Sequence, residues 1–540
     1  MERHILSIVA LVPVAGALAV LIAARVLPGR DGVLRAIAGA TTLLALAASL
    51  PLWRLFEVRG AQFQFVDRVD VFPTIGTGYV VGVDGLAVLL VLLTTTLACL
   101  AVFASWANVT ERTKQYFSAV LLLEAGMLGV YVSLDLLLFT LCWTVAAVSM
   151  CVLIRATGRE ADAWLRVALV GILPSLLILA GVIALSVHAR ALTGIATFDL
   201  RMFQNLTLST TVQRWVFLAF AAGFSAAIVG VFRWWLSAAG SNRAVTVPLL
   251  LAAVFFKMGT FGFLRLSMPL LPEATRFFAP VVVGLSAMGI VFGAVAAFAQ
   301  TSWTRVLAYA SLSHVCLVVL GAFALTPDGL TGSAVHQINH GLSIAALFLV
   351  AGLVADRGQS VAISDYGGLL NAMPLVAGTW LLLTLSLVGV PKLNGFVGTE
   401  LIIEGLWPVS RTWATMAIGG LALGGIALLW LFSRMMLGEL RGPAADVLKD
   451  LRLREALVVV PLVALVVWAG LKPLPFLATI ETSVARVVLR VSPQYAPDVA
   501  DCLAQPPPKA DPGLPTGMVL MAPCSDAAGG ATATQAGQKR

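Results

Sequence analysis

The chain has 540 residues, of which 59% are hydrophobic and only 11% are charged. A soluble globular domain carries about 25% charged residues, so this composition excludes that class and suits a lipid bilayer as the solvent. The formal net charge of +8 does not indicate nucleic acid, because Lys and Arg fall in short loops at the ends of apolar stretches, as the positive-inside rule requires.

Apolar stretches of about 20 residues, the length that crosses a bilayer, recur along most of the chain. In lipid these must be helices, because a helix satisfies its own backbone hydrogen bonds and the alternation typical of barrel strands is absent. The predicted fold is all-α and polytopic, with about fourteen transmembrane helices of this length. The predicted spans are residues 5–26, 33–53, 84–105, 116–133, 135–154, 163–187, 213–236, 246–270, 277–299, 304–325, 332–354, 371–407 with a break, 412–437 and 456–473.

The first stretch is interpreted as a retained helix rather than a signal peptide, because it is long and has no small-residue cleavage site before Arg25. Placing the N-terminus on the non-cytoplasmic side puts most of the loop arginines in the cytoplasm and both termini outside. Five arginines are exceptions to the positive-inside rule, because they fall in outer loops: Arg59, Arg68, Arg190, Arg201 and Arg276.

The segment from Leu477 to Val491 is amphipathic, with Ile480 and Val484 on its apolar side, and is predicted to lie on the membrane surface. From residue 492 onward Pro, Ala, Gly and Thr dominate, which is typical of a disordered tail. Four cysteines lie in apolar stretches without metal-ligand spacing and are interpreted as packing residues: Cys99, Cys142, Cys151 and Cys316. Two others, Cys502 and Cys524, lie in the tail and are candidates for a disulfide.

Charged residues within spans are functional candidates, because a charge at mid-bilayer costs about 2.5–3.5 kcal/mol on insertion scales. Glu124 lies in LLLEAGMLG and Lys257 in VFFKMGTFG, each in the middle of a predicted helix. Burial brings the protonation equilibria of both groups toward neutral pH, which suits a proton path. The alternative is that the two side chains pair with each other and only fix helix packing.

Histidines occur in two neighbouring spans, His314 in SLSHVCL and His340 in HQINHGLS, with His336 one turn before His340. Because histidine titrates near physiological pH, a pair in adjacent helices favours a polar track that relays protons. The alternative is that each is a satisfied core residue. Zinc ligation is not expected, since His336 and His340 have no evident third ligand.

The stretch GVPKLNGFVGTELIIEG interrupts an apolar span with Pro391, Lys392, Asn394 and Glu400. Pro and Gly free backbone groups, which is tolerated at membrane depth only beside protein or a water-filled cavity. The stretch is therefore the best candidate for a broken helix in an ion path. A nucleotide-binding loop, a CxxC cluster and a catalytic triad motif are all absent, so the chain gives no sign of cofactor chemistry of its own.

The strings YVVGVDGLAVLL, KMGTFGFLRLSMPLLPEA, LAYASLSH, INHGLSIAALFL, DYGGL and GVPKLNGFVG resemble the antiporter-like chain M family of the proton-pumping NADH-quinone oxidoreductase, respiratory complex I. The resemblance runs from about residue 5 to 491. It implies fourteen helices with two inverted five-helix repeats, here helices 4–8 and 9–13, each with one broken helix, the seventh and the twelfth.

The resemblance assigns the family's polar residues one by one. Lys257 matches the central lysine of helix eight and Glu124 the glutamate of helix four. His314 and His340 match the histidines of the polar axis, and Asp84 matches the aspartate of the GVDG motif.

The chain also departs from this family. Thr144 follows Trp143 where the family has glutamate in helix five, and Ala226 or Ala227 stands where helix seven carries lysine, without the prolines that would break that helix. In helix twelve the glutamate is displaced by one position to Glu400, or replaced by Thr399, and a one-residue shift turns a side chain by about 100°.

Two interpretations follow from these departures. In the first, the chain is a divergent paralogue whose first half-channel is closed. In the second, Glu124, Arg233 and Lys392 have taken over parts of the route.

The expected function is that of a proton-translocating membrane-arm subunit of a complex I-like oxidoreductase, with a proton path through Glu124, Lys257, His314, His340, Lys392 and Glu400. The resemblance places NADH, FMN, iron–sulfur clusters and quinone in partner subunits, and none in this chain. It implies membrane-arm partners and an inner (cytoplasmic) membrane location. Two alternatives remain: a subunit of a multisubunit cation/proton antiporter or ion-coupled uptake complex, and a non-pumping structural subunit.

The expected domains follow the same scheme: N-terminal helices in 1–110, repeats in 111–271 and 272–440, the last helix with the amphipathic segment in 441–491, and the tail in 492–540.

Overall fold

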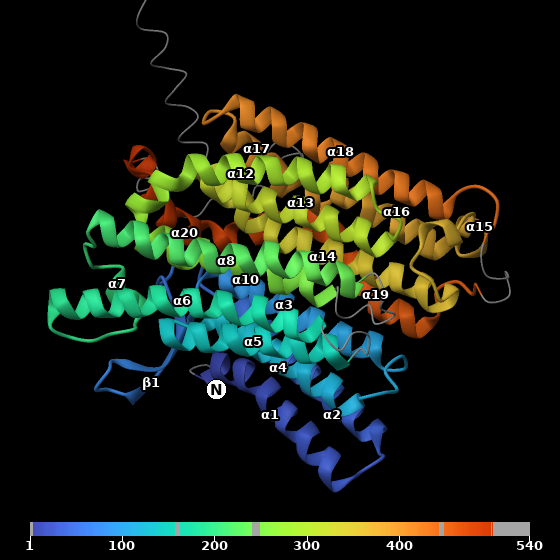
Figure 1. Ribbon diagram of the computed structural model, residues 1–540, viewed down its shortest axis with the longest axis horizontal. Helices are drawn as coiled ribbons and strands as arrows, with labels where there is room; N and C mark the ends of the chain where they lie inside the picture. The colour runs from blue at the N-terminus through green and yellow to red at the C-terminus, as the bar shows by residue number, and fades with distance from the viewer. Residues whose placement is uncertain (1–3, 157–162, 240–248, 442–447, 498, 500–540) are drawn as a thin grey trace, which may run out of the picture.

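The computed structural model describes residues 4–156, 163–239, 249–441, 448–497 and 499, and of residues 163–170 and 226–239 it describes the backbone alone. The described chain is a bundle of long helices that run side by side, with a two-stranded hairpin at one end (Figure 1). The elements are α1 (Ile5–Val26), α2 (Asp31–Leu55), β1 (Gln64–Phe72), β2 (Thr77–Val83), α3 (Gly85–Ser105), α4 (Thr113–Val132), α5 (Leu136–Ala156), α6 (Ala163–Thr193), α7 (Leu200–Phe203), α8 (Thr210–Ala239), η2 (Leu251–Phe255), α10 (Phe256–Gly262), η3 (Phe263–Ser267), α11 (Met268–Leu270), α12 (Pro272–Phe298), α13 (Trp303–Phe323), α14 (Pro327–Gly358), η4 (Ile363–Asp365), α15 (Leu369–Ala372), α16 (Pro374–Val388), α17 (Asn394–Leu406), α18 (Arg411–Met436), α19 (Leu453–Leu471), α20 (Leu474–Val491) and η5 (Pro493–Tyr495).

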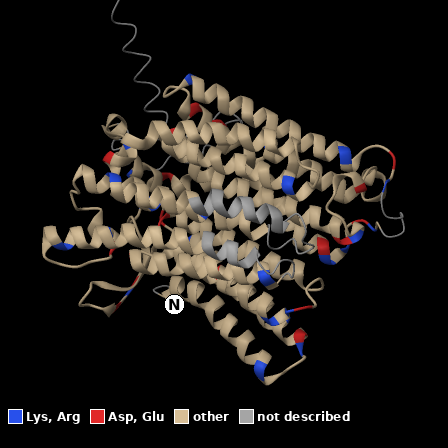
Figure 2. Cartoon of the chain, in the orientation of Figure 1, with Lys and Arg blue, Asp and Glu red and all other residues tan. Residues whose placement is uncertain are grey.

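The spans agree with the sequence prediction. Twelve helices of the described chain are long and apolar enough to cross a membrane. The 30-residue α8 and the broken pair α16 and α17 match the other two predicted spans. Charged side chains lie mainly toward the two ends of the helices (Figure 2). The predicted class, a polytopic α-helical membrane protein, is confirmed, while the hairpin β1–β2 was not predicted.

The two ends of the bundle differ in structure. One end, called here the hairpin end, carries the antiparallel strands β1 and β2, the start of α1 and the helix α20 (Figure 1). The opposite end, called the loop end, carries the turn between α1 and α2, the turn between α3 and α4, and the loop from α18 to α19. These names fix directions along the helices without assigning either end to a side of the membrane.

Two successive sets of five spans make up the middle of the chain. The first set is α4, α5, α6, α8 and the segment Leu251–Leu270, and the second is α12, α13, α14, the pair α16–α17, and α18. Because five spans separate equivalent helices, α4 begins at the loop end and α12 at the hairpin end. This is the inverted-repeat arrangement expected from the resemblance, while the exact domain limits stay a prediction.

The fourth span is broken in the second set of five helices and continuous in the first. In the second set the chain leaves α16 at Gly389 and re-enters a helix at Asn394, and both Gly389 and Lys392 have left-handed φ angles of 87° and 72°. In the first set α8 is one uninterrupted helix, as expected from its lack of proline. The break predicted in GVPKLNG is therefore present, and only this fourth span is broken.

The centre of the bundle is formed by helices that are buried along most of their length. In the most apolar window of Leu251–Leu270 every residue is buried, and in that of α14 94% of the residues are buried. In the most apolar window of α19 only 28% of the residues are buried. The outer faces of α1 and α12 expose large apolar side chains, among them Leu18, Ile22, Val281 and Phe292. Polar residues of the central helices are therefore shielded from lipid by other helices.

The helix α20 crosses the hairpin end and packs against α3, α11, α12 and α14. The side chains predicted to form its apolar side, including Ile480 and Val484, are buried in these contacts. The prediction that this segment rests on the membrane surface is therefore wrong for its apolar face. An amphipathic pattern marks a helix that covers an apolar surface, and here that surface is protein rather than lipid.

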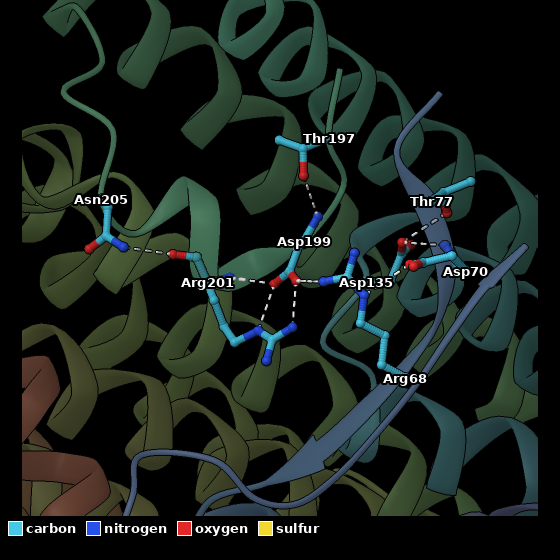
Figure 3. Close-up of polar contacts among 9 residues, drawn as sticks. Arg68, Asp70, Thr77, Asp135, Thr197, Asp199, Arg201 and Asn205 are labelled. Atoms are coloured by element: carbon cyan, nitrogen blue, oxygen red, sulfur yellow. Dashed lines mark hydrogen bonds and ion pairs between the residues drawn. The ribbon is translucent and has the colours of Figure 1, made fainter. Parts of the chain in front are cut away.

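The hairpin is fixed to the bundle by Asp135, which precedes α5. One carboxylate oxygen accepts hydrogen bonds from the backbone N–H groups of Leu137 and Leu138, both at 2.9 Å. The other accepts from the Thr77 hydroxyl at 2.8 Å and from the Gly78 N–H at 3.1 Å (Figure 3). A single carboxylate thus caps a transmembrane helix and holds the start of β2.

A second carboxylate lies beside this anchor. Asp199 precedes α7 and binds the Arg201 guanidinium at 2.6 Å, and Arg68 of β1 approaches it at 3.7 Å (Figure 3). These contacts connect β1 with the chain that follows α6.

Several predictions concern residues outside the described part of the chain. Cys502, Cys524 and nearly all of the tail beyond residue 497 lie there. The side chains of Ala226, Ala227 and Arg233 are likewise not described. Cys99, Cys142, Cys151 and Cys316 are free thiols within the bundle, in agreement with their interpretation as packing residues.

Candidate functional site

The central helix of the bundle is irregular on both sides of Lys257. α10 is a seven-residue α-helical segment between two π-helical turns, η2 and η3. Such turns widen a helix by one residue, interrupt its regular hydrogen bonding and occur often at functional sites. The irregularity therefore coincides with the predicted lysine.

Lys257 is fully buried and lies next to His340 of α14. Its Nζ is 2.7 Å from Nδ1 of His340, and it donates a longer bond of 3.5 Å to the carbonyl oxygen of Ala252. A hydrogen bond between an amine and an imidazole nitrogen provides a direct route for a proton from one group to the other. The structure thus brings together two of the residues predicted from the sequence.

Three imidazoles form a cluster beside Lys257. The ring of His314 on α13 lies over those of His340 and His336, with centroid distances of 5.1 and 5.4 Å. Nδ1 of His314 is 3.1 Å from Nε2 of His336. His336 was not among the predicted site residues, although its spacing of four from His340 places both on one face of α14. All three rings are buried.

A second polar contact lies one turn closer to the hairpin end. The hydroxyl of Thr260 donates to the side-chain carbonyl of Gln337 at 2.7 Å. Gln337 precedes His340 by three residues, and its Nε2 has no hydrogen-bond partner among the described residues. Neither residue was predicted, because a single amide in an apolar helix gives no signal until its neighbours are known.

Asn394 organises the break between α16 and α17. It exchanges side-chain to backbone hydrogen bonds with Asn339 of α14 at 2.7 and 2.9 Å. Its Oδ1 also accepts from Ser386 at 2.5 Å and from Ser343 at 3.1 Å. Because the break leaves backbone groups without helical partners, these bonds make the interruption tolerable at membrane depth.

The broken helix approaches the histidine cluster at Gly398. A Cβ at this position would lie 2.6 Å from Cβ and 2.8 Å from Nδ1 of His336. Only glycine therefore allows α17 to pack against the imidazole at this distance.

Glu124 is buried on α4, but it does not pair with Lys257. Neither of its carboxylate oxygens has a hydrogen-bond partner in the described part of the chain, and the lysine bonds to His340 instead. The alternative that these two residues form a packing ion pair is therefore wrong. A carboxyl group buried without a partner is expected to carry its proton.

Two other predicted residues lie away from the cluster. Lys392 is exposed within the break, and Glu400 is partly exposed on α17, one turn before the exposed Glu404. The inward face of α17 is formed by Gly398, Leu401 and Ile402. The displacement of the glutamate by one position thus turns its side chain out of the axis, as the helical period requires.

The position of the family's helix-five glutamate is also away from the cluster. Thr144 is partly exposed, and its hydroxyl donates to the carbonyl oxygen of Thr140 at 2.8 Å. This bond is internal to α5, and among the described residues the Thr144 hydroxyl bonds to no other helix.

A buried ion pair lies on the hairpin side of the cluster. The Arg265 guanidinium in η3 donates to Asp84, which precedes α3 and also accepts from the N–H of Ala87 at 2.9 Å. The guanidinium carbon lies 4.5 Å from the ring centre of Phe63 and 5.6 Å from that of Phe261. Asp84 was noted from the GVDG motif, whereas Arg265 was not predicted.

Fold and site together define a polytopic membrane protein with inverted repeats, one broken helix and a buried lysine–histidine axis. The family described as "NADH:quinone oxidoreductase/Mrp antiporter, TM" matches residues 133–424, and the chain belongs to this family. It is 32% identical to NADH-quinone oxidoreductase subunit M of Mycobacterium tuberculosis over 547 aligned positions, which cover 93% of this chain and 97% of that protein.

Two solved structures have the same fold. A chain of respiratory complex I from Thermus thermophilus with bound NADH superposes with a TM-score of 0.81 at 26% identity, covering 91% of this chain and 100% of that one. A chain of the Mrp complex from Dietzia superposes with a TM-score of 0.77 at 20% identity, covering 92% and 99%. At that identity the second likeness extends to the fold alone.

Proposed function

We propose that this chain is a proton-translocating membrane-arm subunit of a complex I-like NADH-quinone oxidoreductase. The single observation that carries the proposal is the buried Lys257–His340 contact of 2.7 Å, continued through His314 and His336. The similarity of this chain to subunit M, together with the complex I chain of the same fold, supports a partnership with redox subunits over a stand-alone antiporter.

The proposed route begins at protonatable groups and not at a cofactor. Lys257 and His340 exchange a proton, and the imidazoles of His314 and His336 extend the exchange toward α17. Glu124 is the candidate for the loop-end part of the route, since it is buried, ionisable and without a partner among the described residues. Lys392 lies exposed in the break and Glu400 partly exposed on α17, and both act, in this proposal, where the chain meets water or a neighbouring subunit.

Electron transfer belongs, in this proposal, to partner subunits that hold NADH, FMN, iron–sulfur clusters and quinone. The membrane-arm partners contact the outer faces of the membrane-spanning helices. The location is the inner (cytoplasmic) membrane, with the hairpin end and both termini on the non-cytoplasmic side. The surplus of arginine in the loop-end turns supports this orientation.

The test is proton translocation by vesicles that contain the assembled complex, with Lys257→Ala compared to the wild type at equal assembly. We expect Lys257→Ala to lose most of its proton translocation. Lys472→Ala, which changes an exposed lysine between α19 and α20, is the matched control and should translocate as the wild type does.

The result also distinguishes the alternatives. Unchanged translocation in Lys257→Ala overturns the proposal and leaves a structural subunit. Translocation that depends on Lys257 but not on NADH or quinone assigns the chain to a cation/proton antiporter instead.

A further inference from the structure

A small chamber lies at the hairpin end of the central axis, between α3, α14 and α20. It has about 20 Å³ open to a water-sized molecule, which is room for about one water. Its polar wall is formed by Asp84, Arg265 and Ser483, and its apolar wall includes Phe261, Leu330 and Val487. Two of these lining residues, Ser483 and Val487, are partly exposed beside α20.

Arg265, which lines the chamber, has an unsatisfied donor. Arg265 donates through its terminal nitrogens to Asp84 and to the carbonyl oxygen of Gly82 at 3.4 Å, but its buried Nε has no partner among the described residues. A buried N–H group without an acceptor costs about 1–3 kcal/mol. The terminal nitrogens hold the rest of the guanidinium in the wall of the chamber, against Asp84 and Gly82.

The chamber is connected to the lysine through one helix. Arg265 follows Lys257 by eight residues, a rise of about 12 Å in a regular helix. Halfway between them, Thr260 and Gln337 form their hydrogen bond beside Phe261, and Gln337 offers a second unpartnered donor. Polar groups therefore occur at each turn from Lys257 to the chamber.

The helix α20 covers the chamber. Ser483 accepts a hydrogen bond from the N–H of Gly85 at 2.9 Å, and a Cβ on Gly85 would lie 1.7 Å from the carbonyl oxygen of Thr479. Glu481 pairs with Arg59 at 3.3 Å, which holds α20 to the segment after α2. Specific contacts therefore fix α20 over the chamber and attach it to α3 and to the segment after α2.

We propose that the chamber at Asp84, Arg265 and Ser483 is the opening through which protons pass between the Lys257–His340 axis and the hairpin side. The inference rests on the proposed function and adds the exit to it. A proton on the lysine moves by way of the Thr260–Gln337 contact to water in the chamber, and from there to solvent. Only N–H and O–H bonds change, and no co-reactant is needed.

The experiment places a removable plug in the chamber after assembly. In a cysteine-free background, in which all six cysteines are replaced by alanine, Val487→Cys is treated from the hairpin side with a membrane-impermeant, positively charged methanethiosulfonate. Leu474→Cys is the matched control, because Leu474 is 48% exposed on the same helix but does not line the chamber. Proton translocation is measured before and after labelling, and again after reduction.

We expect labelling at Val487→Cys to abolish translocation, and reduction to restore it, while labelled Leu474→Cys keeps its activity. Labelling of Val487→Cys without loss of translocation overturns the proposal, as does a failure of the reagent to reach this position while it reaches Leu474→Cys. If the cysteine-free chain does not assemble, Val487→Trp and Leu474→Trp in the native chain provide the same comparison, with loss of translocation expected only for the first.

Lys257→Ala separates the two proposals. If it translocates normally, the proposed function fails. If it does not, and the plugged chamber has no effect, only the chamber proposal fails.

Discussion

Gly398 of α17 lies directly against the imidazole of His336 on α14, and the space that a Cβ would need is already filled by the histidine's own Cα and Cβ atoms at 2.9 and 2.6 Å. The broken helix and the histidine cluster are therefore in direct contact. A change at this glycine acts on both.

Gly398→Ala should displace α17 from His336, because the new methyl group overlaps atoms that cannot move without the helix. We expect a loss of about 1–3 kcal/mol in stability together with reduced proton translocation, measured by thermal denaturation of the purified complex and by vesicle assays. Gly419→Ala in α18 is the control, since nothing lies within 4 Å of its Cβ position. Equal melting temperatures for the two variants contradict the prediction.

His340→Ala should leave Lys257 with only the long bond to Ala252. Because the imidazole exchanges a proton with the lysine in the proposed route, we expect proton translocation to fall on the order of 10²-fold, the size of a lost general acid–base contribution. The complex should still assemble, and this is checked by native electrophoresis. His188→Ala changes a partly exposed histidine of α6 and should translocate normally. A normal rate for His340→Ala would remove this histidine from the route.

Glu124→Gln tests whether the unpartnered carboxyl carries protons or only fills space. Glutamine has nearly the same shape as a protonated glutamate, so we expect unchanged assembly and thermal stability. We expect proton translocation to fall, because the amide cannot release a proton. Full translocation with full stability would give Glu124 a packing role.

Asp135→Ala removes the acceptor for four hydrogen bonds that hold α5 and the hairpin. Loss of a helix cap costs about 0.5–2 kcal/mol, and each buried donor left unsatisfied adds to this. We expect a lower melting temperature and faster proteolysis of β1–β2, with translocation retained by the folded fraction. Asp70→Ala is the control, because its contact with Arg68 is exposed. Proteolysis at the wild-type rate would contradict the anchoring role.

The sequence predicts the spans and the break well, because both follow from local properties. Span 5–26 coincides with α1, and the break falls at residues 389–393 where Gly and Pro interrupt the apolar run. Lys257 and His340 were selected because a charge or an imidazole in lipid is rare enough to be noticed alone. The contact between them follows from the packing of the central segment Leu251–Leu270 on α14, mainly through η2, which no local pattern encodes.

The face that a residue occupies is harder to predict in a membrane protein. A helix surrounded by lipid and protein is apolar on all sides, so its period does not mark the inward face. For this reason the outward position of Glu400 and the role of Gln337 emerge only from the structure. The predicted location of α20 was wrong for a related reason. Its amphipathic pattern is the same whether lipid or the bundle covers its apolar side.

The continuity of α8 has a consequence for hydration. A helix of 30 residues without a break satisfies its interior backbone groups and offers water no main-chain partners at mid-membrane. The turn from Gly389 to Leu393 does offer them, beside Asn394 and its serines. Internal water should therefore gather at this turn rather than along α8, so that dehydration rather than a missing charge becomes the barrier beside α8.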